Sequence, residues 1–292
     1  MYWQSMLNGE CLVEKMDNIL RRFLIEDRVC IITGGAGLLG RKHAEAILSG
    51  GGIPCLIDIS QDSLNSAKTE LEDCFKKHVE VYCVDITNKN QLEDVLRDLI
   101  EKYGHIDILI NNAANNPKME AKSANIGNIQ FHNLPIEIWQ NDIAVGLTGA
   151  FLCSQVFGAQ MARQGKGVIL NISSDLGVIA PDQRIYRKEG VSEENQTVKP
   201  VTYSVIKHGL IGLTKYLATY WAEKGVRANA ICPAGVENGQ PEDFIHKLTD
   251  LVPMGRMASK DEYQCTVLYM VSDASSYMTG STVIVDGGRT CW

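Results

Sequence analysis

The sequence lacks an excess of positive charge. It carries 28 Lys and Arg residues against 35 Asp and Glu residues, which gives a formal net charge of −7 at pH 7. No cluster of basic residues goes beyond short pairs such as Arg21-Arg22 and Lys76-Lys77. Nucleic acids and anionic membranes are bound by basic patches, so the composition argues against both as partners. A small molecule is the expected ligand.

Cysteine motifs and long apolar runs are also missing. The nine cysteines are scattered, without a C-x-x-C pair or a metal-ligand spacing, so we expect no metal site and buried thiols in a reducing cytoplasm. No continuous apolar run approaches the roughly 20 residues that span a bilayer. Charged residues from Glu10 to Asp17 interrupt any signal-peptide core. We expect residues 1–27 to be an N-terminal extension: a short amphipathic helix, a disordered tail, or the product of an upstream start codon.

From Arg28 onward, strand and helix patterns alternate. Short apolar runs such as "RVCIIT" and "IPCLIDI" are typical of strands buried on both faces of a parallel sheet, and helix-forming stretches follow them. This alternation predicts an α/β fold of the Rossmann type, with a doubly wound parallel sheet. No linker or change of composition divides the chain, so residues 28–292 are predicted to form a single domain.

Two polar segments depart from this alternation. Residues 115–134 and 180–201 are long and irregular, and each follows a predicted strand. Loops of this length inside a compact domain are usually functional or disordered. Ligands of open α/β sheets bind at the carboxyl ends of the strands, so we expect both segments to form walls of the substrate pocket.

A glycine-rich turn, "TGGAGLLG", follows the first predicted strand and opens the first helix. Gly34, Gly37 and Gly40 would permit positive φ, let the backbone approach a pyrophosphate, and pack the helix against the strand. The pyrophosphate would lie at the helix N-terminus, so Leu38 and Leu39 are also predicted cofactor contacts. A plain strand-to-helix turn is the alternative explanation of the glycines.

Asp58 strengthens the prediction of a dinucleotide. It ends the second predicted strand, 18 residues after Gly40. A carboxylate at this place accepts hydrogen bonds from the adenosine ribose and repels a 2′-phosphate, so NAD is favoured over NADP. A helix cap or a turn residue is the alternative role of Asp58.

Tyr203 and Lys207 lie four residues apart in a predicted helix. Residues at this spacing share one helix face, so the ammonium can approach the phenol. A nearby cation lowers the pKa of a tyrosine, which suits acid/base catalysis near neutral pH. Taken alone, the same spacing is common among polar pairs on helix surfaces.

Five motifs occur in a recognisable order: the glycine-rich turn, "NNAA", "NISS", "YSVIK" and the terminal "STVIVDGG". In this order they resemble the short-chain dehydrogenase/reductase family, and the resemblance covers about residues 28–290. It implies that Tyr203 is the catalytic acid or base. It also implies that Lys207 holds the nicotinamide ribose and lowers the tyrosine pKa, and that Ser174 polarises the substrate oxygen.

The same resemblance implies further cofactor contacts. Asp85 and Ile86 would lie on the adenine side, Asn112 and Ala113 would form the wall beside the ribose, and the backbone of Val236 would contact the carboxamide. For the "NNAA" and "CPAG" turns, a purely structural role is the alternative. Family members usually form dimers or tetramers through the helix of the Tyr-x-x-x-Lys segment and the helix before it, so a homodimer or homotetramer is expected.

The glycine turn departs from the single-domain branch of the family. That branch usually reads T-G-x-x-x-G-x-G, whereas residues 33–40 read T-G-x-x-G-x-x-G, with Leu38 in place of the second glycine. The observed spacing resembles the extended branch, which contains nucleotide-sugar epimerases and dehydratases. An epimerase or dehydratase that retains its NAD is therefore an alternative function.

Gly146 is a second departure. Family members usually have an asparagine here, which helps to hold a water in a proton relay to the lysine. We hypothesise that Gly146 allows a helix kink that frees a backbone carbonyl to bind this water. Because this asparagine is missing, a catalytically silent NAD-binding regulator is an alternative function.

The spacing between Ser174 and Tyr203 is a third departure. It amounts to 29 residues, where family members commonly have about a dozen, and the excess is the polar insertion 180–201. A solvated surface loop is one interpretation of this insertion. The other is a contact with hydroxyls and phosphate of a substrate through its basic and aromatic side chains: Arg184, Tyr186, Arg187 and Lys188.

Several longer stretches, among them "DIAVGLTGAF" and "KPVTYSVIKHG", are similar to one subgroup of the family, the oxidoreductases of bacterial flagellin-glycosylation clusters. This resemblance implies that the substrate is a sugar nucleotide or a sugar phosphate. The predicted reaction is hydride transfer between NAD and a secondary alcohol or ketone, in which Tyr203 moves the proton and Ser174 donates a hydrogen bond to the oxygen.

Overall fold

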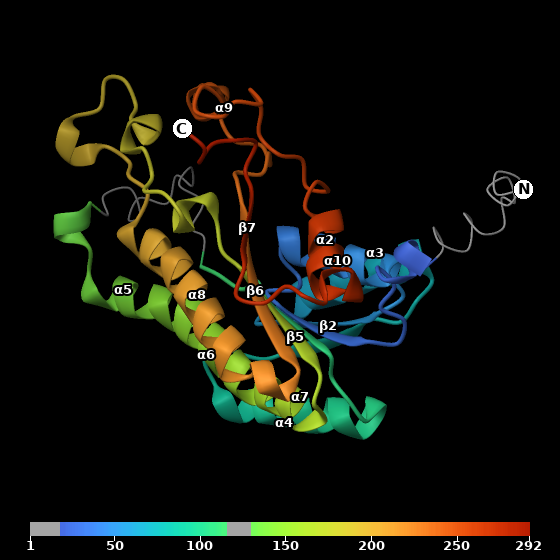
Figure 1. Cartoon of the computed structure of the whole chain (residues 1–292). Coiled ribbons are helices and arrows are strands. Elements are labelled where there is room, and N and C mark those ends of the chain that lie inside the picture. Colours follow the sequence, from blue (N-terminus) through green and yellow to red (C-terminus); the bar gives the residue numbers. More distant parts are fainter. Residues whose placement is uncertain (1–17, 116–129) are drawn as a thin grey trace, which may run out of the picture.

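The computed structural model describes residues 18–115 and 130–292. Within that part of the chain, seven parallel strands form one sheet in the order β3-β2-β1-β4-β5-β6-β7 (Figure 1). The strands are β1 (Val29–Thr33), β2 (Ile53–Asp58), β3 (Glu80–Cys83), β4 (Ile108–Asn111), β5 (Gly167–Ile172), β6 (Val226–Pro233) and β7 (Thr282–Val285). The chain winds outward from β1 in one direction and from β4 in the other, which confirms the predicted doubly wound α/β fold.

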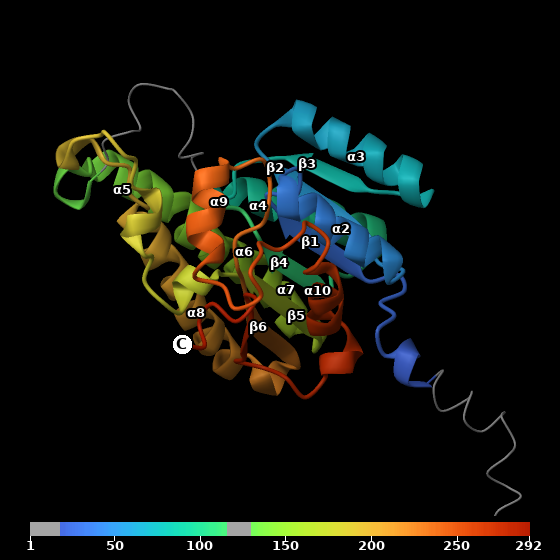
Figure 2. The same ribbon diagram turned by 90° about the horizontal axis from the view of Figure 1, so that it is seen from above.

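Helices cover both faces of this sheet (Figure 2). One face packs against α2 (Leu38–Ser49), α3 (Gln61–Phe75) and α10 (Gln264–Val271). The opposite face packs against α4 (Lys89–Tyr103), α6 (Gly149–Cys153), α7 (Ala159–Gln164) and α8 (Val201–Tyr220). A further helix, α9 (Glu242–Thr249), lies above the carboxyl ends of the strands (Figure 1).

Burial and capping explain where these elements begin and end. All residues of β1 and β5 are buried, as expected for strands that are covered on both faces. Helix α4 begins after Asn88, whose side chain accepts hydrogen bonds from the backbone N–H groups of Asn90 and Gln91. It ends at Gly104, which has a φ of +77°.

The helical stretch Ile136–Gln164 comprises α5 (Ile136–Ile143), α6 and α7, joined by two π-helical turns. By length and composition alone it could cross a membrane, although Asp142 interrupts its apolar residues and it is not a continuous apolar run. Half of its most apolar window is buried inside the domain. Core helices of soluble proteins meet the same criterion, and the feature alone is therefore weak evidence of a membrane span.

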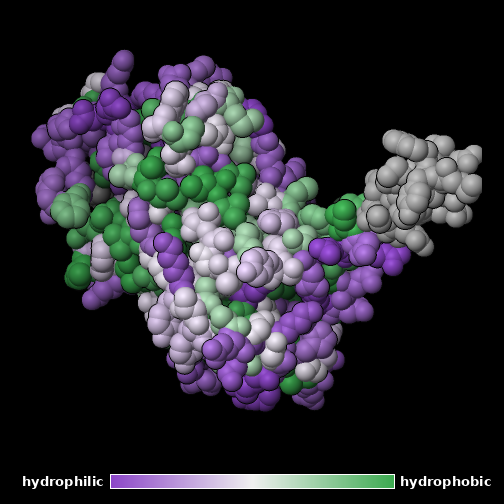
Figure 3. Space-filling view, viewed as in Figure 1, coloured by the Kyte–Doolittle hydropathy of each residue, from purple (hydrophilic) through white to green (hydrophobic). Residues whose placement is uncertain are grey.

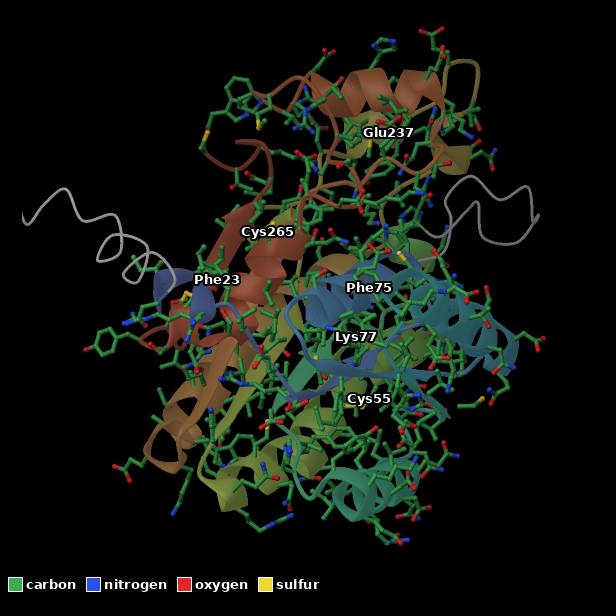
Figure 4. The ribbon with its side chains drawn as sticks, turned by 90° about the vertical axis from the view of Figure 1, so that its right-hand side faces the viewer. Phe23, Cys55, Phe75, Lys77, Glu237 and Cys265 are labelled. Atoms are coloured by element: carbon green, nitrogen blue, oxygen red, sulfur yellow. The ribbon has the colours of Figure 1, made fainter. Side chains whose placement is uncertain are left out.

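Part of the predicted N-terminal extension packs onto the domain. Ile25 is fully buried in the cluster beneath α2 and α10, and its N–H donates to the carbonyl of Gly50. The ring of Phe23 lies beside α10, 6.3 Å from the ring of Tyr269 (Figure 4). The packed part of the chain thus begins before Arg28, while residues 1–17 lie outside the described residues.

The described cysteines are all free. Burial raises the pKa of the Cys30, Cys55 and Cys153 thiols, so these three are unreactive at neutral pH. Within residues 18–115 and 130–292, no group of three or more His, Cys, Asp or Glu side chains is placed to hold a metal ion.

The insertion 180–201 folds back on itself and contacts α9, where Lys247 donates a hydrogen bond to the carbonyl of Arg187. It contains two short 3₁₀ turns, Gln183–Tyr186 and Glu193–Asn195. Ile185 from the first turn is buried together with Leu248 and Met257, which anchors the insertion to the segment that carries α9. The insertion is therefore a packed part of the domain.

Candidate active site

The structure brings Ser174, Tyr203 and Lys207 together at the carboxyl edge of the sheet. Ser174 follows β5, and Tyr203 and Lys207 lie in the first two turns of α8. Pro200 caps this helix, and a proline suits a helix start because its missing N–H would have no partner there. The hydroxyls of Ser174 and Tyr203 are hydrogen-bonded, and the Lys207 ammonium lies 5.6 Å from the centre of the tyrosine ring.

Lys207 is held by contacts between α8 and β5. Its ammonium donates a hydrogen bond to the carbonyl oxygen of Ile172 at 2.7 Å. Its own backbone carbonyl accepts a hydrogen bond from the Ser173 hydroxyl, also at 2.7 Å. The side chain is buried, and this burial lowers the pKa of Lys207 to about 8, assisted by repulsion from Lys199.

Burial also controls the titration of Tyr203. Burial raises the pKa of the phenol, the hydrogen bond with Ser174 lowers it, and the charge of Asp175 raises it, with a net rise. The expectation that Lys207 would leave this tyrosine with a lowered pKa is therefore wrong for the structure as it stands. Desolvation outweighs the nearby cation.

Asp175 and Arg289 extend the site in a way that the sequence analysis missed. The Ser174 hydroxyl donates to Asp175 Oδ1 at 2.6 Å, and the N–H of Leu176 donates to Ser174 Oγ at 3.2 Å. The other carboxylate oxygen, Asp175 Oδ2, accepts from Arg289 Nη1 at 2.7 Å, and both charged side chains are buried. An aspartate directly after the motif serine was a signal in the sequence, but nothing there indicated that Arg289 is its partner.

Lys199 is a second cation beside the tyrosine that sequence reasoning missed. Its ammonium lies over the Tyr203 ring, 3.9 Å from the centre, and is thus closer to the ring than Lys207. Two of the basic residues for which a contact with substrate phosphate was one interpretation pair with carboxylates inside the insertion: Arg184 with Asp182, and Arg187 with Glu193.

The two irregular segments line one pocket of about 210 Å³. Residues 130–132 contribute Gln130, Phe131 and His132, and the insertion contributes Gln183, Arg187, Glu193, Gln196, Thr197 and Val198. Apolar surface gathers directly below α9 on the face seen in Figure 3. Residues 116–129, which belong to the other predicted pocket wall, lie outside the described residues.

The glycine-rich turn has no room for a Cβ at Gly34 or at Gly40. Gly34 has a φ of +61°, and a Cβ there would lie 2.9 Å from Ala113 Cα. A Cβ on Gly40 would collide with the carbonyl oxygen of Gly34, so α2 can approach the turn only through a glycine. Gly37 precedes α2 and supplies no side-chain cap to its first N–H groups.

Two predicted cofactor residues brace this turn. Asp58 ends β2, and its carboxylate accepts from the N–H of Ala36 at 3.3 Å. The Asn112 side chain donates to the carbonyls of Thr33 and Gly34 at 3.0 and 3.1 Å. The "NNAA" segment thus has the structural role that the sequence left open, and Asp58 borders the turn on its other side.

Asp85 and Ile86 differ in exposure. Asp85 is exposed, and one carboxylate oxygen accepts from the N–H of Thr87 at 2.8 Å in a local turn. Ile86 is buried, and a Cβ on Gly149 would lie 2.5 Å from its terminal methyl group. The Asp85 carboxylate is accessible, whereas the Ile86 side chain packs against α6.

The remaining predicted contacts lie at the same end of the sheet. Leu38 is exposed and Leu39 packs on the core beside α2. Val236 follows β6 and forms an isolated parallel bridge with Ala258. Its neighbour Glu237 is exposed in the loop below α9 (Figure 4).

These features fit a bound dinucleotide. The turn at Gly34 and Gly40 leaves a cradle that a Cβ would fill, and the first N–H groups of α2 open onto it. Asp58 supplies a carboxylate at the edge of this cradle, where a ribose binds in folds of this topology. Tyr203 and Lys207 lie in α8, at the carboxyl edge of the same sheet, where Lys207 bonds the carbonyl of Ile172 at the end of β5.

A Rossmann sheet with a serine, a tyrosine and a lysine at its carboxyl edge defines a nicotinamide-dependent oxidoreductase. The family model described as "Enoyl-(Acyl carrier protein) reductase" matches residues 35–290. The chain belongs to the short-chain dehydrogenase/reductase family and is an enzyme that acts on CH–OH groups or the corresponding carbonyls.

Three curated relatives show how broad the similarity is. A 3-oxoacyl-[acyl-carrier-protein] reductase of Thermotoga maritima is 31% identical over 90% of this chain and 98% of its own length. Post-translational flagellin modification protein A of Campylobacter coli is 30% identical over 91% and 99%. An NAD-dependent glycerol dehydrogenase of Listeria innocua is 31% identical over 92% and 96%. The relatives share the family and differ in the substrates that their names state.

Solved structures agree with this fold. A short-chain dehydrogenase from Leptospira borgpetersenii with bound NAD+ superposes with a TM-score of 0.76 at 31% identity, covering 92% of this chain and 95% of its own. A gluconate 5-dehydrogenase from Burkholderia cenocepacia in complex with NADP and tartrate gives 0.79 at 24% identity, covering 94% and 99%. Relatives of this fold are thus known with either nicotinamide cofactor.

Proposed function

We propose that this enzyme is an NAD-dependent oxidoreductase that interconverts a secondary alcohol and a ketone on a sugar-linked small molecule. The observation that carries the proposal is the convergence of Ser174, Tyr203 and Lys207 at the carboxyl edge of the sheet. The similarity to relatives named for glycerol oxidation and for flagellin modification supports a polyol or sugar-derived substrate. A sugar nucleotide or sugar phosphate is the particular substrate that we propose.

When bound, NAD supplies or accepts the hydride. Tyr203 transfers the proton: its phenol protonates the oxygen during reduction, and its phenolate removes the hydroxyl proton during oxidation. Ser174, whose hydroxyl donates to Asp175 in this structure, would turn this proton to the substrate oxygen as negative charge develops on it. Lys207, fixed by its bond to the Ile172 carbonyl, stabilises the phenolate and holds the ribose.

The assignment of NAD rather than NADP depends on Asp58. Its carboxylate lies at the edge of the glycine turn, where it would accept hydrogen bonds from the ribose hydroxyls and repel a 2′-phosphate. Gly34, Gly37 and Gly40 would admit the pyrophosphate, with Leu38 and Leu39 at the helix N-terminus. Further contacts proposed for the cofactor come from other loops: Asp85, Ile86, Asn112, Ala113 and Val236.

A second candidate is an epimerase or dehydratase that retains its NAD. The observation that favours it is the glycine spacing of residues 33–40, which resembles the extended branch. Cofactor that stays bound through purification, with no net absorbance change at 340 nm during turnover, would support this candidate over a dehydrogenase. The convergence of Ser174, Tyr203 and Lys207 argues against a silent NAD-binding regulator.

We also propose that the enzyme forms a homodimer or homotetramer through α8 and the helix before it. Tyr216 and Tyr220 on α8 are each 62% exposed, and their rings stack 5.5 Å apart. Phe151 on the neighbouring α6 is also exposed. Together these side chains give the α8 surface an aromatic character that suits burial against a second copy.

The experiment is a direct assay of cofactor reduction. Purified enzyme is mixed with NAD or NADP and with a panel of polyols, sugar phosphates and sugar nucleotides, and absorbance at 340 nm is followed. We expect NADH production with at least one sugar-linked alcohol and a slower reaction with NADP. The absence of cofactor reduction across the panel, in a protein that binds NADH, would favour the epimerase or dehydratase.

A further inference from the structure

Tyr186 differs from the other basic and aromatic side chains of the insertion 180–201. Arg184 and Arg187 are exposed, and each forms an ion pair with a carboxylate of the insertion. Lys188 is exposed as well. The side chain of Tyr186 is partly buried against the domain. Tyr186 is therefore the one of these four side chains that packs inward.

Packing holds the ring of Tyr186 in place. It lies 5.5 Å from the ring of Phe244 in α9, a separation at which aromatic rings attract one another. It also packs against a buried apolar cluster: Ile185, Leu248 and Met257. A phenol whose ring is already fixed loses little conformational freedom when its hydroxyl binds a ligand.

The turn that carries Tyr186 is joined to the start of α8. The side-chain amide of Gln183 accepts from the N–H of Lys199 at 2.9 Å and donates to its carbonyl at 3.2 Å. The Lys199 ammonium in turn lies 3.9 Å from the centre of the Tyr203 ring. The two ends of the insertion thus meet beside Tyr203, and the turn Gln183–Tyr186 borders the proposed reaction site.

Charges of this site act on the Tyr186 phenol. Burial raises its pKa, the charge of Arg289 lowers it, and Tyr203 and Asp175 raise it, with a net rise. The phenol is therefore neutral at physiological pH. In this form its hydroxyl can both donate and accept a hydrogen bond, which suits an alcohol group as its partner.

The hydroxyl of Tyr186 has no partner within residues 18–115 and 130–292, and it is not sealed from solvent. Other tyrosines that are not exposed bond to protein acceptors: Tyr82 to Asp98 at 2.6 Å, Tyr103 to Glu80 at 2.9 Å and Tyr263 to the carbonyl of Ala234 at 3.2 Å. Partly buried hydroxyls are usually satisfied in this way. The hydrogen-bonding capacity of Tyr186 is thus left for a ligand.

We propose that Tyr186 forms a hydrogen bond with a hydroxyl group of the substrate other than the one that reacts at Tyr203. Tyr186 then selects polyols and sugar derivatives over simple alcohols. A site with a phenol placed for a substrate hydroxyl binds the analogue without that hydroxyl less well, because the bond is not formed. This inference rests on the proposed oxidoreductase function and specifies its substrate class: a carbinol that carries a further hydroxyl group.

The test measures binding in two matched pairs. Full-length enzyme saturated with NADH is titrated by calorimetry with glycerol and propylene glycol, and with glucitol and 2-deoxyglucitol. The members of each pair differ in one hydroxyl group. We expect the member with the additional hydroxyl to bind roughly fivefold more tightly in at least one pair, as one neutral hydrogen bond provides. A wild type that shows no preference in either pair, whether it binds both members or neither, overturns the inference.

Variants then assign the preference to Tyr186. Tyr186→Phe keeps the ring that packs against Phe244 and removes only the hydroxyl. It should bind both members of the pair equally, with the affinity that the wild type has for the member without the hydroxyl. Tyr277→Phe removes the hydroxyl of a fully exposed tyrosine and should behave as the wild type. An unchanged preference in Tyr186→Phe overturns the inference.

Failure of the inference is separable from failure of the proposed function. An enzyme that reduces NAD with a sugar-linked alcohol, and whose Tyr186→Phe variant keeps the wild-type preference, retains the proposed function and loses only the role of Tyr186. A protein that does not take up NADH loses the proposed function and the inference with it. Tyr203→Phe provides the complementary control, because it should keep the preference in calorimetry while turnover is lost.

Discussion

The guanidinium of Arg289 lies 2.7 Å from the carboxylate of Asp175, and both side chains are buried beside Ser174. Arg289 follows β7 and lies 114 residues after Asp175, so a residue distant in the sequence neutralises a charge beside Ser174. Asp175 in turn accepts a hydrogen bond from the Ser174 hydroxyl and raises the pKa of Tyr203. This buried ion pair links the loop after β7 to Ser174 and Tyr203.

Removal of Arg289 should therefore move the pH profile. In Arg289→Met the Asp175 charge is no longer paired, and it should raise the pKa of Tyr203 further, so the rising limb of kcat/KM for alcohol oxidation moves to higher pH. The double variant Asp175→Asn with Arg289→Met lacks the charge and should bring the limb back. A limb that stays in place in Arg289→Met would contradict this coupling. Breaking a buried pair costs about 3–5 kcal/mol, so folding is checked by calorimetry in parallel.

The side chain of Ile206 leaves no room for a Cβ at position 146, which explains the glycine there. It lies in the π-helical turn Ala144–Thr148, and a Cβ on it would stand 2.8 Å from a methyl carbon of Ile206, the neighbour of Lys207. The asparagine usual in the family does not fit without a shift of Ile206. Gly146→Ala should lower the free energy of unfolding by about 1–3 kcal/mol in urea titrations.

Gly212 offers a matched control for this prediction. It lies in α8, and a Cβ there would meet nothing within 4 Å. Gly212→Ala should raise stability by roughly 0.5–1 kcal/mol, because alanine favours the helix. Coupling is tested by combining Gly146→Ala with Ile206→Ala, which should cost less than the sum of the two single changes. Equal effects at Gly146 and Gly212 would exclude the steric explanation.

His43 should make stability depend on pH. It is buried in α2, and burial lowers the pKa of its imidazole to about 4 from an ordinary value near 6.5, partly offset by the Asn112 side chain. Between these values the unfolded chain takes up a proton that the folded chain does not. Stability is therefore fully present above pH 6.5 and falls by roughly 3 kcal/mol as the pH drops to 4.

The measurement compares unfolding by urea at several pH values in the wild type and in His43→Leu. The leucine variant should lack this part of the pH dependence, whatever its stability at pH 7. Parallel curves for the two proteins between pH 6.5 and 4 would show that His43 is not the group responsible.

Asp58 should determine the choice of cofactor. Asp58→Asn keeps a side chain that can accept from the N–H of Ala36 but removes the negative charge. We expect the affinity for NADPH to rise relative to that for NADH, by about tenfold or more, because repulsion of the 2′-phosphate is relieved. Dissociation constants from the fluorescence of each bound cofactor measure the change. An unchanged ratio of the two dissociation constants would mean that Asp58 only stabilises the glycine-rich turn.

Much of the site could be predicted from the order of the strands and helices and from the spacing of residues along the sequence. Strand ends of a parallel sheet meet at one edge, so Ser174 after one strand and Tyr203 on the following helix were expected to converge, and helical spacing placed Lys207 beside the tyrosine. The apolar runs predicted the sheet for the same reason: strands covered on both faces, such as β1 and β5, must be apolar throughout.

Other features depend on the path of the chain in space. Arg289 lies 114 residues from Asp175, and no local pattern links them. Lys199 reaches the tyrosine because Gln183 and Ile185 determine how the insertion folds. The direction of the Tyr203 pKa shift depends on burial, which the sequence does not state. Local patterns therefore predicted that Ser174, Tyr203 and Lys207 would lie together, while their partners and the directions of their pKa shifts depend on the tertiary structure.

The most direct test of the central claim is the turnover of Tyr203→Phe. The phenylalanine variant keeps the ring beneath Lys199 and loses only the hydroxyl that transfers the proton. NADH affinity should stay as in the wild type, and kcat for the substrate found in the 340 nm assay should fall by about 10²–10⁴-fold. Turnover within a few-fold of the wild type at unchanged NADH affinity would contradict the assignment of Tyr203 as the acid/base residue.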